Sequence, residues 1–219
     1  SRVQPNVDAS LPCLNEAIPA DDKVRQIERF RTGFGLSPSL AADETEPVEL
    51  LGIQLTPVEH AQVLRQLEYQ SQAGIHESAV AAMVGEYYGG VKICHDRGGV
   101  VQILVKRDAE SQPDGLAGLN RRILADFGKF FPIELREVEF SLADLQALRD
   151  SLERVRAPYF NETGSAIRSI QVDIEHNQVR VGSGGTPNLD VLADLLDEDL
   201  AERTLASDTR FSTRLPIEN

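Results

Sequence analysis

The sequence contains no tryptophan, one methionine and two cysteines, and aromatic residues make up only 5% of it. A hydrophobic core must therefore be built mainly from Val, Leu, Ile and Ala. Hydrophobic residues still account for 41% of the 219 residues, which indicates a globular chain long enough to bury a core. No apolar run approaches the roughly 20 residues that a membrane-spanning helix needs.

Positive charge is also scarce. The chain carries 22 Lys and Arg against 35 Asp and Glu, which gives a formal net charge of -13. Affinity for nucleic acids rests on Lys and Arg that neutralise phosphates, so this balance argues against DNA, RNA and anionic membranes as partners. The simplest role of such a charge is to keep the chain soluble.

Cys13 and Cys94 are too far apart to form a CxxC metal or redox motif. They could form one disulfide that closes a long loop, or they could be two unrelated thiols, and the sequence leaves both alternatives open. No signal-peptide pattern stands at the start of the chain. We therefore expect that a signal peptide has been removed or never existed.

The four histidines are His60, His76, His95 and His176. They are scattered along the chain, and none belongs to an HExxH or HxxxH pattern. Cys94 precedes His95 directly, but neighbouring residues on a strand point to opposite faces, which disfavours a Cys-His dyad. The acidic residues from Asp190 to Asp199 lack the ligand order of an EF-hand. The sequence therefore predicts no catalytic residues, no metal ligands, no cofactor and no enzyme activity.

Helical spacing of apolar residues predicts five helices. Two of them span residues 23–34 and 116–127, and the other three begin at Thr56, Leu142 and Thr186. Thr56, Pro57 and Glu59 form a capping box at the start of the second helix, which we expect to end at Gly74. Ser141 and Asp144 form a second capping-box signature, at the start of the fourth helix. Residues 37–55 are expected to be a loop, residues 76–86 a short helix or a link, and residues 158–164 another loop.

Two hairpins, over residues 87–105 and 166–182, and a strand over residues 133–140 complete the prediction. In the second hairpin, strict alternation places Ile170 and Val172 on one face and Ile167 and Ser169 on the other. Glu175 to Asn177 supply its polar turn.

These elements predict an α+β fold, in which an antiparallel or mixed sheet of two hairpins and an extra strand carries helices on one face, preceded by an N-terminal helical segment. The predicted organisation is an extended lead-in (1–21), a helical region (22–86), an α+β domain (87–206) and a tail (207–219).

Three blocks, in this order, resemble the pro regions of alpha-lytic protease and of streptogrisin-type secreted bacterial serine proteases. The first is the hairpin of Tyr88–Ile93 and Arg97–Val105, the second is the strand-to-helix junction Val138–Leu145, and the third is the hairpin Ile170–Val181. The blocks cover about half of the chain. The Gly-Asp-Ser-Gly-Gly motif of such proteases does not occur in the sequence.

The resemblance implies a secreted or periplasmic protein that assists the folding of a serine protease and inhibits it. In that family a sheet edge pairs with the protease and the C-terminal tail enters its active site, which is a form of β-augmentation. The corresponding strand residues are Ile170, Val172, Val179 and Val181, and the tail follows Leu205. The alternative is a stand-alone extracellular structural or ligand-binding domain on the same fold, without a protease partner.

Overall fold

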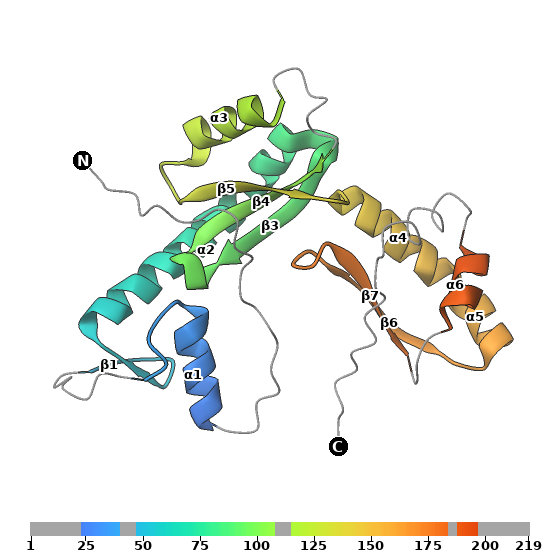
Figure 1. Cartoon of the computed structure of the whole chain (residues 1–219), viewed down its shortest axis with the longest axis horizontal. Coiled ribbons are helices and arrows are strands. Elements are labelled where there is room, and N and C mark those ends of the chain that lie inside the picture. Colours follow the sequence, from blue (N-terminus) through green and yellow to red (C-terminus); the bar gives the residue numbers. More distant parts are fainter. Residues whose placement is uncertain (1–22, 40–46, 108–114, 184–187, 197–219) are drawn as a thin grey trace. The chain divides into compact units, whose positions relative to one another are not determined.

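The computed structural model describes residues 23–39, 47–107, 115–183 and 188–196 (Figure 1). Its first elements are α1 (Lys23–Gly33), β1 (Val48–Leu50), β2 (Ile53–Leu55), α2 (Pro57–Val84) and the 3-10 turn η1 (Gly85–Tyr87). Next come β3 (Tyr88–Cys94), the 3-10 turn η2 (His95–Arg97), β4 (Val100–Lys106), α3 (Gly115–Phe127) and β5 (Ile133–Val138). The last are α4 (Leu142–Arg154), α5 (Arg156–Thr163), β6 (Ile167–Asp173), β7 (Gln178–Ser183) and α6 (Leu189–Leu195).

The predicted α+β class is confirmed. The described strands form three sheets, with orders β1-β2, β3-β4-β5 and β6-β7, so the extra strand β5 joins the first predicted hairpin and the second hairpin stands as its own sheet. Among the described residues, no helix has both the length and the apolar character of a membrane span.

The chain divides into two compact units. Unit 1 comprises Ser1–Met83, Val91–Ile103 and Gln112–Arg136, and unit 2 comprises Val84–Gly90, Leu104–Ser111 and Glu137–Asn219. This division does not follow the predicted boundary between residues 86 and 87, because strands β3, β4 and β5 each contribute residues to both units. The predicted lead-in and tail lie outside the described residues.

Helix α2 continues past Gly74 to Val84, so the expectation that Gly74 ends the helix is wrong. Ala73, Val80 and Val84 are buried and extend the apolar stripe of the first half of the helix. Their burial outweighs the roughly 1 kcal/mol that a glycine costs inside a helix.

The predicted loop over residues 37–55 contains the antiparallel hairpin β1-β2, in which Leu50 pairs with Ile53. Ile53 and Leu55 bury their side chains against Leu36 and Val63. This small cluster gives the hairpin a core that its short strands could not supply alone.

The β1-β2 turn is strained at Leu51. Leu51 and Gly52 both have positive φ (52° and 76°), and the Leu51 side chain is 79% exposed. A branched L-residue is disfavoured in this region by about 1 kcal/mol, whereas Asn-Gly is the preferred pair for such a turn. We expect Leu51→Asn to raise the free energy of unfolding of unit 1 by about 1 kcal/mol in urea titrations. A loss of stability would show that the Leu51 side chain makes a contact in solution.

In unit 2, the predicted loop over 158–164 is wrong, because residues 156–163 form α5. Pro158 stands in the first turn of that helix, where no intrahelical N–H bond is needed. Gly164 ends α5 with φ of 68°. The buried Tyr159 hydroxyl accepts a hydrogen bond from the Asn188 backbone N–H at 2.8 Å, which ties α5 to the cap of α6.

Candidate functional site

The β6-β7 hairpin carries the sequence block that the predictions place at a partner surface. The strands pair in antiparallel register from Asp173 and Gln178 to Ile170 and Val181. The register then shifts between Ile167 and Ser169, so Arg168 is an extra residue in β6. Such a bulge reverses the side-chain alternation beyond it. Ile167 therefore joins Ile170 on the buried face, which corrects the strict alternation predicted for this strand.

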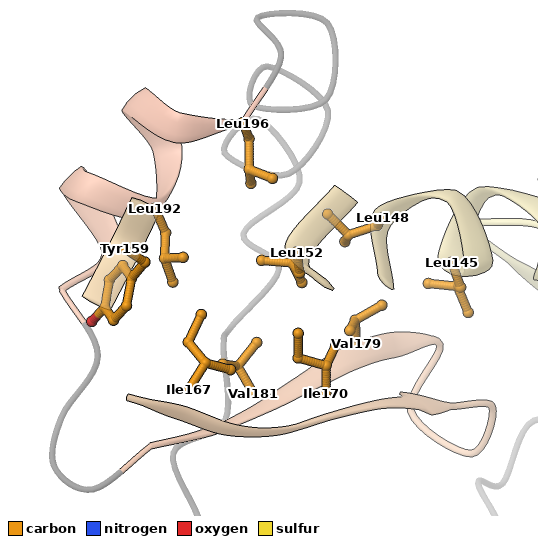
Figure 2. Packing of buried hydrophobic residues seen from close by; sticks show 10 residues of the cluster. All are labelled: Leu145, Leu148, Leu152, Tyr159, Ile167, Ile170, Val179, Val181, Leu192 and Leu196. Atoms are coloured by element: carbon orange, nitrogen blue, oxygen red, sulfur yellow. The ribbon is translucent and has the colours of Figure 1, made fainter. Parts of the chain in front are cut away.

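The inner face of the hairpin belongs to the core of unit 2. Figure 2 shows side chains of the two strands directed at leucines of α4, with Tyr159 and Leu192 at one end of the cluster. Ile170, Val179 and Val181 are buried, and Val172 packs against the same cluster. The structure thus places Ile170, Val179 and Val181, three of the four residues predicted to bind a partner, in the protein's own core, and Val172 is partly buried against it. Their backbone is the part best placed for an intermolecular contact.

The outer face of the hairpin is polar. Ser169 and Gln171 are exposed, and Gln171 lies opposite Arg180 on the neighbouring strand. Within the described part of the chain, β6 and β7 each have one hydrogen-bonded neighbour, because their sheet has only two strands. Among the described strands, no third strand pairs with the outer edge of β6 or β7, and the packed core behind the hairpin holds the backbone donors and acceptors of these edges in place.

Asn177 fixes the tip of this hairpin to the β5-α4 junction. Its backbone has the positive φ (52°) that the sequence suggested for this turn. Its Oδ1 accepts hydrogen bonds from the N–H groups of Glu139 and Phe140 at 3.1 and 2.8 Å, and its Nδ2 donates to the Phe140 carbonyl at 2.8 Å. The conformation of the turn could be predicted from its residue types. The hydrogen-bonding partners of Asn177 lie 37 and 38 residues earlier in the chain, and no local sequence pattern points to them.

Next to the tip, Asp173, His176 and Arg180 form a charged cluster that the sequence did not predict. The His176 Nδ1 lies 2.8 Å from Asp173 Oδ2, and an Arg180 guanidinium nitrogen lies 2.5 Å from the same oxygen. Arg180 also lies 3.0 Å from His176 Nδ1. A guanidinium can only donate, so the arrangement that satisfies the carboxylate has both His176 Nδ1–H and Arg180 donating to Asp173.

The donor atoms of Asp173, Glu175 and His176 lie within 4.8 Å of one another and are of types that bind metal ions. Arg180 already supplies the positive charge at Asp173 and would repel a cation there. The cluster is therefore better described as an ion-pair network that shapes the turn than as a metal centre.

Asp173 has a lowered pKa. Burial raises the pKa of this carboxyl, but the hydrogen bond from His176 and the charges of His176 and Arg180 outweigh burial and lower it. The pKa of Asp144 is also lowered: burial raises it, and bonds from Lys106 and Ser141 outweigh that effect. A carboxyl with a depressed folded-state pKa stabilises the fold above its unfolded pKa of about 3.9, and this stability is lost as the pH falls through the folded value.

We therefore expect unit 2 to lose stability in acid, and Asp173→Asn to lose less than the wild-type protein. Urea unfolding at neutral pH and below about pH 3.9 measures the difference. Asp150, whose side chain is 63% exposed, supplies the control variant Asp150→Asn, which should keep the wild-type pH dependence. An unchanged pH dependence in Asp173→Asn would contradict this role of the network.

The other candidate residues of the sequence do not converge on this hairpin. His76 stacks on Phe130, with ring centroids 4.4 Å apart in unit 1, and His95 lies beside Phe34 in the same unit. Cys94 is fully buried. Its predicted partner, Cys13, lies outside the described residues, as do most of the acidic residues between Asp190 and Asp199, so the disulfide stays a prediction.

The sequence matches no protein-family model and no curated protein.

Proposed function

We propose that this chain is a secreted, non-enzymatic protein-interaction module that binds a serine protease, assists its folding and inhibits it. The β6-β7 hairpin is the proposed contact. The observation that best supports this proposal is the two-stranded sheet itself. Its inner face packs on helices, and each of its described strands has one hydrogen-bonded neighbour.

Strand addition suits such a hairpin. An extended segment that pairs with a sheet edge gains affinity from backbone hydrogen bonds and specificity from alternate side chains. Four apolar side chains of the hairpin belong to the core or pack against it, namely Ile170, Val172, Val179 and Val181. They would stiffen the strands rather than contact the partner. Polar residues of the outer face, such as Gln171 and Arg180, would supply the side-chain contacts.

The three resemblance blocks support the same proposal. They fall on the strands β3 and β4, on the β5-α4 junction and on the hairpin β6-β7. The junction and the second hairpin are joined by the three Asn177 hydrogen bonds, so two of the blocks form one hydrogen-bonded substructure in unit 2.

The proposal is tested by mixing the full chain with purified streptogrisin-type proteases. We expect inhibition at micromolar or lower concentrations and faster recovery of activity when a denatured protease is refolded in the presence of the chain. A chain that changes neither quantity would contradict the proposal and would favour a stand-alone extracellular domain.

A further inference from the structure

His95 forms a small polar and aromatic contact that joins three elements of unit 1. It begins the η2 turn between β3 and β4, and its ring centroid lies 4.5 Å from that of Phe34, which directly follows α1. Its Nδ1 lies 3.1 Å from Oε1 of Gln66 on α2. We call this contact of Phe34, Gln66 and His95 the clasp.

The hydrogen bonds of Gln66 fix the proton on His95. Gln66 is 1% exposed, and its Nε2 donates to the Phe34 carbonyl at 3.2 Å. Its Oε1 can only accept, so His95 Nδ1 must carry a hydrogen and donate. A second proton would therefore go to Nε2 and would place a full positive charge within the clasp.

The turn also fits closely against both helices. A Cβ atom on Gly35 would lie 2.7 Å from the Asp96 carbonyl oxygen, and one on Gly99 would lie 3.0 Å from Cγ of Gln66 and 3.1 Å from Cδ2 of Tyr69. Both glycines have positive φ. These close approaches hold the turn against its neighbours, and the His95 ring within it is half-buried, so a charged ring would lose part of its hydration there.

Asp96 is the charged group of the turn that acts on His95, and it raises the pKa of the imidazole. Arg97 of the same turn donates to Glu134 at 2.7 Å. Towards α1 and α2, the groups in contact with the ring are the Phe34 ring and the Gln66 amide, which do not titrate, and Tyr69 approaches the turn at Gly99. Burial lowers the pKa of His95 and outweighs Asp96.

We propose that the clasp is an acid-sensitive device: protonation of His95 releases the β3-β4 turn from α1 and α2. When the turn is released, His95 is exposed to water and has its ordinary pKa of about 6.5. Because the clasped form has the lower pKa, the released form takes up the proton first. The clasp is at full strength above about pH 6.5 and weakens as the pH falls below that value.

Amide hydrogen exchange on the full chain tests this proposal. The N–H groups of Gly98 and Gly99 donate to the carbonyls of His95 and Cys94 within the turn, and Gly99 packs against Gln66 of α2, so we expect their protection to fall when the turn leaves the helices. We expect this protection, corrected for intrinsic exchange, to fall several-fold between neutral pH and about pH 5. The protection of β6 and β7 in unit 2 should change less over the same range.

His95→Asn is the matched variant, because the Asn amide keeps a donor towards Gln66 but does not titrate. Its turn amides should show no pH-dependent loss, whereas His60→Asn should behave like the wild-type protein. An NMR titration of the wild-type imidazole needs no variant and should give His95 a pKa below 6.5. A pKa at or above that value, or equal pH responses in His95→Asn and wild type, would overturn the proposal.

Discussion

Arg31→Ala is expected to lower the free energy of unfolding of unit 1 by about 3 kcal/mol or more, because removing one partner of a buried ion pair leaves the other uncompensated. The Arg31 side chain is 2% exposed and forms an ion pair with Glu59. Its Nε donates to the Ser37 carbonyl at 2.6 Å, and one terminal nitrogen donates to the Gln54 carbonyl at 3.0 Å. A single guanidinium thus joins α1 to the segment after it, to β2 and to the start of α2.

Urea unfolding measures the effect, with two further variants as references. Arg25→Ala on the same helix removes an exposed arginine and should change the stability by no more than about 0.5 kcal/mol. Arg31→Lys keeps the charge but not the planar set of donors, so it should lose a large part of the stability. An Arg31→Ala protein as stable as Arg25→Ala would show that the buried ion pair does not hold unit 1 together.

Asn177→Ala is expected to lower the free energy of unfolding of unit 2 by about 3 kcal/mol, since each of three hydrogen bonds contributes roughly 0.5 to 1 kcal/mol and a residue with a Cβ is strained by about 1 kcal/mol at positive φ. The three hydrogen bonds to Glu139 and Phe140 would be lost, and alanine tolerates φ of 52° less well than asparagine.

Asn177→Gly separates the two contributions. Glycine adopts the positive φ freely but lacks the amide, so we expect it to lose about 2 kcal/mol. Equilibrium unfolding of both variants provides the comparison. If Asn177→Gly were as stable as the wild-type protein, the side-chain bonds to the β5-α4 junction would contribute nothing in solution.

Local sequence signatures predicted the elements whose determinants lie within a few residues. Thr56 and Glu59 exchange both capping hydrogen bonds, and Ser141 and Asp144 do the same before α4. The turn at Asn177 has the conformation that its amino-acid type favours. In each case one short segment contains all of the partners, so the pattern alone is sufficient.

Features that depend on distant partners were not predictable. The same Glu59 that caps α2 also pairs with Arg31, which lies 28 residues earlier and has no distinguishing pattern. The bulge at Arg168 shifts Ile167 into the core, and α2 runs through Gly74, because burial against other elements outweighs the local preference. For the same reason the alternation that singled out Ile170, Val172, Val179 and Val181 located an apolar face but could not show that the protein's own helices cover it.

The most direct test of the proposed function is amide hydrogen exchange of the full chain with and without a streptogrisin-type protease. Strand addition at one edge predicts new protection at alternate amides of either β6 or β7, whose outward N–H groups would bond to the added strand. The β1-β2 hairpin of unit 1 is the other two-stranded sheet among the described residues, and it provides an internal control whose exchange should not change. Protease binding that leaves the exchange of both β6 and β7 unaltered would contradict the claim that this hairpin is the contact surface.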